Sequence, residues 1–135
     1  YCSAHFCFPS GKHRLRASRK PSAIWHGQPA LHQSTFFKTQ EHIHYEYDTS
    51  FVVSADYDLI CRLRQAGKIA KSSSLLVSKF NTDVNSISAR NRFKLILEVA
   101  RSQYVVLRLN LPLVLYSMAR RILAMSIVSI RRYLP

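Results

Sequence analysis

Residues 54–67, with the sequence SADYDLICRLRQAG, carry the clearest structural signal in the chain. From Asp56 onward the apolar residues recur at helical spacing and fall on one face. These apolar residues are Leu59, Ile60, Leu63 and Ala66. Gly67 is placed to end a helix, and Ser54 is placed to cap its start. Asp56 and Asp58 fall in the first turn, where carboxylates interact favourably with the helix dipole. The stretch therefore predicts an amphipathic helix with two acids at its N-terminal end.

The charge of the chain is strongly positive, and its few acids are concentrated around this helix. The 135 residues include 20 Lys and Arg but 7 Asp and Glu, for a net charge of +13. Five of the seven acids lie between residues 41 and 58. Such an excess of positive charge attracts phosphates, whether on nucleic acid, lipid headgroups or a nucleotide. With only three glycines, the chain contains no glycine-rich phosphate-binding loop.

Outside the helix, the N-terminal two thirds of the chain has the pattern of a mixed α/β structure. Strand-like composition marks residues 1–8, 34–38 and 68–80. The basic segment 14–16 fits either an exposed strand or a loop. Residues 24–29 predict a loop, because Gly27 and Pro29 interrupt regular structure. The aromatic and acidic segment 42–48 is predicted to be irregular.

The C-terminal third of the chain predicts helices. The apolar residues of segment 88–107 keep a helical spacing; they are Phe93, Ile96, Leu97, Ala100 and Tyr104. Residues 109–130 are the most apolar part, and Pro112 should restart or kink the helix. Arg120 and Arg121 divide this part into two runs of about ten residues, each too short to span about 30 Å of hydrocarbon. We therefore divide the chain into an α/β part, residues 1–86, and a helical part, residues 87–135.

Three spaced motifs carry a resemblance to a known family. The first is GQPALHQSTFF at residues 27–37, and the second is Tyr47-Asp48 followed by ADYDL at residues 55–59 and a helix ending at Gly67. The third is the strand-like Val77-Ser78-Lys79-Phe80. In this order and spacing, over about residues 24–90, they resemble family 2 glycosyltransferases of the GT-A fold that build bacterial surface polysaccharides. The resemblance implies a partial GT-A-like mixed sheet with helices, followed by a helical C-terminal region.

The resemblance implies only the acceptor-side portion of such an enzyme. The family's nucleotide-binding half, with the DxD motif that holds a divalent metal, has no counterpart in the sequence, and residues 83–88 replace the family's Gly-Gly-x-Ser element without glycines. We therefore expect the chain to begin inside a larger protein and to be inactive alone. The magnesium or manganese ion of the full-length enzyme should be bound by residues outside this chain. The missing half would supply the site for the nucleotide-sugar donor.

The resemblance also implies roles for individual residues. Asp56 would be the general base of an inverting transfer, removing the proton from a hydroxyl of a saccharide or lipid-linked saccharide acceptor. His32 and Gln33 would hydrogen-bond the acceptor or the donor sugar, Trp25 would stack on a sugar ring, and Tyr57 would contribute to substrate binding. The structural alternatives are a helix-dipole role for Asp56, a structural histidine and a loop-anchoring tryptophan. Asp58 is expected to be structural and to pair with an arginine.

Two other classes of function compete with the enzyme. A small basic nucleic-acid-binding module would explain the charge, but no zinc-finger, RNP-type or helix-turn-helix pattern supports it, and we expect no specific nucleic acid partner. A noncatalytic interaction domain would use the apolar residues 104–135, whose arginine pairs suit an anionic membrane surface. The alternative for these helices is packing on protein. The three cysteines form no framework pattern, and Cys2, His5 and Cys7 lack a second ligand pair for zinc, so we predict reduced thiols and no metal site. The expected location is the cytoplasm, at the inner face of the plasma membrane.

Overall fold

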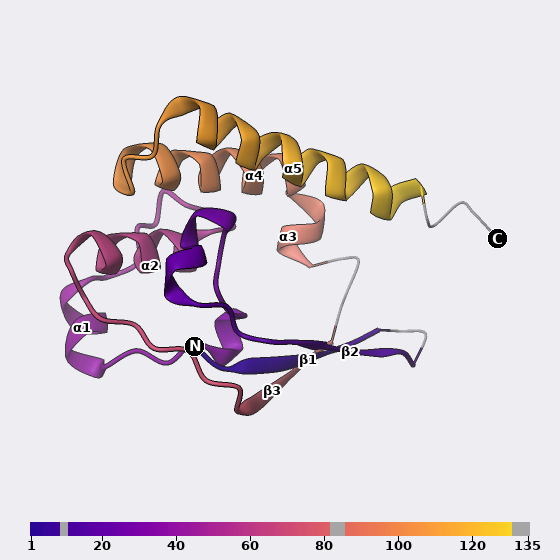
Figure 1. The fold of residues 1–135 in the computed structure, drawn as a ribbon, viewed down its shortest axis with the longest axis horizontal. Coiled ribbons are helices and arrows are strands. Elements are labelled where there is room, and N and C mark those ends of the chain that lie inside the picture. The colour runs from indigo at the N-terminus through magenta and orange to yellow at the C-terminus, as the bar shows by residue number, and fades with distance from the viewer. Residues whose placement is uncertain (9–10, 82–85, 131–135) are drawn as a thin grey trace.

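The computed structural model describes residues 1–8, 11–81 and 86–130, with the backbone alone for 127–130, and has an α/β fold. Its small mixed sheet has the strand order β2-β1-β3. The central strand β1 (Ser3–Cys7) pairs antiparallel with β2 (His13–Arg16) and parallel with β3 (Leu76–Asn81). In Figure 1 the sheet forms the lower layer, and helices cover one side of it.

The helices fall into two groups, one between β2 and β3 and one after β3. The first group contains η1 (Pro21–His26), η2 (His32–Ser34), α1 (Thr39–His44) and α2 (Ala55–Gln65). The second contains α3 (Ile87–Arg90), α4 (Arg92–Arg101), the π-helical turn η3 (Ser102–Val106) and α5 (Leu111–Ile130). Figure 1 shows α4 and α5 side by side above α2 and the sheet.

Helix α2 confirms the prediction from residues 54–67. It is followed by Gly67, which adopts the left-handed conformation with φ of 73° that commonly ends helices. The predicted capping role of Ser54 is wrong in detail. Ser54 occupies the cap position, but its side chain makes no capping bond and its Oγ donates instead to Glu98, 3.2 Å away.

The boundaries of several other elements differ from the prediction. Residues 34–38 do not form a strand, because the backbone N–H of Ser34 closes the 3-10 turn η2 onto Leu31. The segment 42–48 is partly helical, since α1 extends to His44. The third predicted strand begins only at Leu76, and the predicted helix over 88–107 is interrupted at Asn91. Pro112 restarts the chain as a helix, lying in the first turn of α5, where its missing N–H is not needed.

The helical part of the chain packs on the α/β part. Val99 of α4 belongs to the same buried cluster as Tyr57, Ile60 and Cys61 of α2 and Ile24 of η1. The predicted apolar face of segment 88–107 is only partly buried. Ile96 and Ala100 are in the interior, whereas the remaining predicted face residues are exposed: Phe93, Leu97 and Tyr104. Within the described residues, no helix combines the length and apolar character needed to cross a membrane.

Candidate functional site

Asp56 lies in the first turn of α2, with its carboxylate at the surface. Its side chain is 23% exposed, and its Oδ2 accepts a hydrogen bond of 2.9 Å from the side-chain amide of Gln28. The Nδ1 atom of His32 lies 3.9 Å from the same oxygen. Burial, and after it the negative charge of Asp56, raises the pKa of the nearby Tyr47 hydroxyl. The structure thus brings the two motifs of the predicted site together at one accessible carboxylate.

The loop before α2 is fixed by Glu98 of α4. This buried carboxylate accepts bonds from the backbone N–H groups of Val52, Val53 and Ser54, at 2.9, 3.0 and 2.9 Å. Burial raises the pKa of Glu98, but the hydrogen bonds lower it by more, so its pKa lies below the ordinary 4.5. Glu98 was not predicted from the sequence. It holds the start of α2, and therefore Asp56, against α4.

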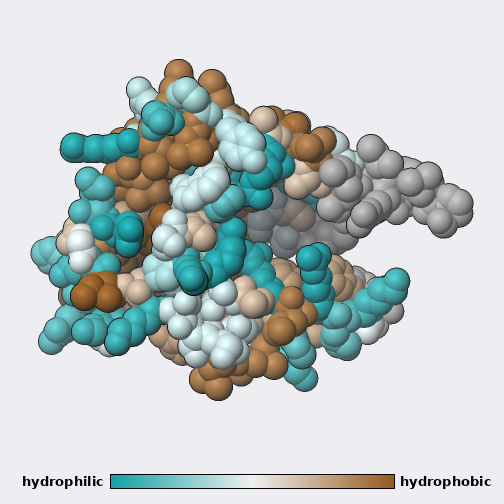
Figure 2. Space-filling model, viewed as in Figure 1, coloured by the Kyte–Doolittle hydropathy of each residue, from teal (hydrophilic) through white to brown (hydrophobic). Residues whose placement is uncertain are grey.

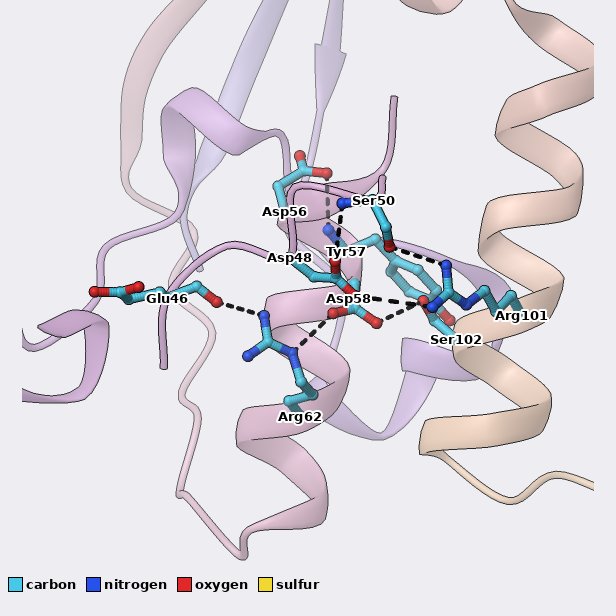
Figure 3. A network of polar contacts seen from close by, with 9 residues as sticks. All are labelled: Glu46, Asp48, Ser50, Asp56, Tyr57, Asp58, Arg62, Arg101 and Ser102. Carbon is cyan, nitrogen blue, oxygen red and sulfur yellow. Dashed lines mark hydrogen bonds and ion pairs between the residues drawn. The ribbon is translucent and has the colours of Figure 1, made fainter. Parts of the chain in front are cut away.

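Asp58 is structural, and its predicted pairing with an arginine is confirmed. Its side chain is 3% exposed, and its Oδ2 accepts a bond of 2.8 Å from Arg62. Its other oxygen accepts a bond of 3.0 Å from the hydroxyl of Ser102 in η3. Figure 3 shows the carboxylates of Asp56 and Asp58 on different sides of the helix start. Of the two acids, only Asp56 is available to a ligand.

The other predicted site residues lie in different environments. His32 and Gln33 are exposed on η2. Trp25 is half-buried, and its ring stacks on His26 with centroids 3.5 Å apart. Tyr57 lies in the core, 2% exposed, with its hydroxyl donating to the carbonyl of Ile24. Burial raises the pKa of the Tyr57 hydroxyl. The side chain packs against η1 and does not face solvent.

A cluster of arginines lies beside this site and was not predicted as a unit. We call it the arginine cluster; its members are Arg16, Arg19, Arg120 and Arg121. Arg16 and Arg19 donate to the backbone carbonyl of Gln28, the residue whose side chain holds Asp56. The sequence shows these arginines only as two basic segments, at residues 12–20 and 120–121. Nothing in their spacing indicates that the fold brings the segments together.

The divalent metal implied by the resemblance finds no fitting set of ligands here. Among the described residues, no three His, Cys, Asp or Glu side chains lie close enough together to bind a metal ion. Comparison of the chain with protein family models, curated proteins and solved structures finds no match.

Proposed function

We propose that this chain is the C-terminal, acceptor-side portion of a glycosyltransferase. The complete enzyme would transfer a sugar from a nucleotide-sugar donor to a saccharide or lipid-linked saccharide acceptor, with inversion. The observation that carries the proposal is the accessible carboxylate of Asp56, held by Gln28 and faced by His32. The three-stranded mixed sheet with its helices is compatible with the broad α/β class to which GT-A enzymes belong. The working location would be the cytoplasmic face of the plasma membrane.

In this mechanism Asp56 removes a proton. An acceptor hydroxyl hydrogen-bonded to its carboxylate attacks the anomeric carbon while its proton passes to Asp56. The amide of Gln28 and the backbone N–H of Tyr57 each donate to one oxygen of the carboxylate, and the remaining lone pairs would accept from the acceptor hydroxyl. His32, with a side chain 53% exposed, is positioned to orient the same hydroxyl. The leaving nucleoside diphosphate would be stabilised by the part of the enzyme that holds the donor.

The first test is the substitution Asp56→Asn in the protein with its natural upstream sequence. Asparagine keeps the size of the side chain and an acceptor for Gln28 but cannot take up the proton. We expect kcat to fall by about 10²- to 10⁴-fold, with donor affinity nearly unchanged. The measurement is release of nucleoside diphosphate from a panel of sugar nucleotides, with Asp48→Asn as the control for loss of a surface charge.

Near-normal turnover of Asp56→Asn would rule out its role as the base. The wider proposal has a simpler check. If the sequence upstream of Tyr1 contains no strand–helix repeats and no DxD motif, the glycosyltransferase proposal fails.

A second candidate function is supported by the exposed apolar surface of the helical part. In Figure 2 hydrophobic residues gather along the upper edge of the molecule, over α4 and α5. Among the described side chains of α5, the large apolar ones that are exposed are Leu111, Leu115, Tyr116, Ile122 and Leu123. With Arg108 and Arg120 nearby in sequence and exposed, this surface suits an anionic membrane surface, with or without catalysis.

Liposome flotation tests this second function. We expect the chain to float with vesicles containing phosphatidylglycerol, and the substitutions Leu115→Asn and Leu123→Asn to reduce the floating fraction several-fold. Ile69→Asn and Leu75→Asn are the matched control, because both residues are exposed elsewhere on the molecule. Equal flotation of the two double variants would contradict a membrane role for α5.

A further inference from the structure

The arginine cluster brings two arginines from the N-terminal part of the chain and two from its C-terminal part to the backbone of residues 26–28. Arg16 and Arg19, from β2 and the segment after it, donate to the carbonyl of Gln28 at 3.4 and 2.7 Å. The two arginines of α5 donate to the carbonyl of His26, Arg120 at 3.1 Å and Arg121 at 2.8 Å. Four guanidinium groups therefore share two neutral acceptors that lie two residues apart.

Among the residues that the structure describes, no carboxylate pairs with these arginines. In the part of the chain that the structure describes, the ion pairs are made by other basic residues, and no member of the cluster has an acidic partner within 4.0 Å. Burial is the main cause that lowers the pKa values of Arg19 and Arg121, and the charge of Arg120 also lowers both. Burial, and then the charges of three cluster arginines, also lowers the pKa of His26. Within the described ranges, the cluster is thus a concentration of positive charge that no carboxylate pairs.

The cluster also retains unused hydrogen-bonding capacity. The Nε atom of Arg121 is buried and has no hydrogen-bond partner among the described residues. A buried donor without a partner is unfavourable, and it would be satisfied only if an anion drew the Arg121 side chain toward itself. The close approach of Arg121 depends on Gly27, since a Cβ atom there would lie 2.5 Å from the guanidinium Nη2. The absence of a side chain at Gly27 therefore leaves room for the Arg121 guanidinium group beside the backbone.

The cluster lines a pocket that also has an aromatic wall. The pocket, of about 660 Å³, lies between the β1–β2 hairpin and α5, which lie one above the other in Figure 1. Phe6 and Phe8 contribute their rings, stacked with centroids 6.4 Å apart, and Arg16 lies 5.8 Å from the centroid of Phe6. The pocket thus offers guanidinium donors on one side and an apolar ring surface on the other.

We propose that the arginine cluster is a binding site for a phosphate or diphosphate ester, with its phosphate on the guanidinium groups and its organic part against Phe6 and Phe8. Guanidinium groups match phosphate oxygens in charge and in the geometry of paired N–H donors. Sugar phosphates, nucleoside diphosphates and lipid phosphates share this chemistry. The proposal does not depend on the glycosyltransferase function, because the four arginines and two phenylalanines that would hold the ligand have no role in the proposed transfer.

The test is a titration of the 135-residue chain with pyrophosphate at low ionic strength. Trp25, the single tryptophan, stacks on His26 at the rim of the pocket, so its fluorescence should respond to binding. We expect saturable binding, confirmed by calorimetry and weakened by added salt. Phenyl phosphate should bind more tightly than inorganic phosphate if the aromatic wall contributes. Absence of saturable binding would overturn the proposal.

The decisive comparison is between two variants that lose the same charge. Arg120→Gln with Arg121→Gln should raise the Kd for pyrophosphate by about tenfold or more, because charge-assisted bonds are lost. Arg90→Gln with Lys94→Gln, on the exposed surface of α3 and α4, should change the Kd by less than about twofold. An equal loss in both variants would mean that only net charge matters, and the site would be rejected.

A second variant guards against misfolding, and competition identifies the source of the phosphate. Arg16→Gln with Arg19→Gln changes the opposite wall of the pocket and should raise the Kd similarly, with circular dichroism confirming the fold of each variant.

Displacement of pyrophosphate by uridine diphosphate supports a soluble ligand. Displacement by vesicles with phosphatidic acid, but not by phosphatidylcholine alone, supports a lipid headgroup. Binding of duplex DNA without any binding of pyrophosphate would overturn the proposal in favour of a nucleic-acid surface.

Discussion

At the scale of single residues, Glu98 has the largest expected influence on the candidate site. Its carboxylate makes hydrogen bonds to three successive backbone N–H groups and to one hydroxyl, all within 3.2 Å. These bonds define the path of the chain just before Asp56. The Glu98 carboxylate therefore links α4 to the start of α2. Loss of this carboxylate should make the position of Asp56, the proposed base, less fixed, without removing any residue that contacts a substrate.

We expect Glu98→Ala to lower the free energy of unfolding by about 3 kcal/mol at neutral pH, because three buried N–H groups lose their acceptor. Glu98→Gln, which keeps one acceptor oxygen, should lose less. The pKa of Glu98 is lower in the folded chain than its ordinary 4.5, so its stabilisation is complete above that pH and is lost as the pH falls through the folded value. Urea denaturation between pH 7 and pH 3 measures both effects.

The same denaturation series contains its own control. Glu98→Gln cannot titrate, so its stability should fall less than that of the natural chain below pH 4.5. Parallel losses of stability in the two proteins would show that other carboxylates cause the acid sensitivity.

At the scale of elements, the turn between η3 and α5 contains a strained residue. Arg108 has a φ of 53°, in the left-handed region that side chains with a Cβ atom rarely occupy. The turn is held by a backbone bond of 3.0 Å from Leu109 N–H to the carbonyl of Gln103. A glycine at position 108 would remove the strain while keeping this bond.

We predict that Arg108→Gly raises the free energy of unfolding by about 0.5 kcal/mol, the relief of strain exceeding the added flexibility of the unfolded chain. Arg64→Gly is the matched control. Arg64 is also exposed but lies within α2, where glycine should destabilise by about 1 kcal/mol. Thermal denaturation of the two variants measures these changes in stability. Destabilisation by Arg108→Gly would contradict the prediction that Arg108 is strained.

The elements differ in how well the sequence predicts them. Helix α2 was predicted because its signals are local: apolar spacing, acids at the start and Gly67 at the end. Segment 34–38 was not, because its contacts are distant. Ser34 bonds to Ser3 and Ser78, which are 31 and 44 residues away in the chain. The exposed positions of Phe93 and Leu97 were also missed, since periodicity identifies an apolar face but not which part of it has a partner.

At the scale of the whole molecule, the site is assembled from segments that the sequence alone does not connect. Asp56 and His32 were predicted, and the structure places them together with Gln28, which lies in the same motif as His32. The arginine cluster could not be predicted, because Arg16 and Arg121 come from opposite ends of the chain. They meet because Arg16 donates to the carbonyl of Gln28 and Arg121 to the carbonyl of His26, which places both in the lining of one pocket.

Gln28 gives the two sites a common residue, with a consequence for how they would work together. Its amide holds Asp56, and its carbonyl holds two arginines. An anion that draws these arginines from the carbonyl would change the restraint on Gln28 and hence on the carboxylate. Thermodynamic linkage is reciprocal, so an acceptor bound at Asp56 would alter anion affinity by the same factor. The chain would then sense occupancy of one site at the other through a single residue.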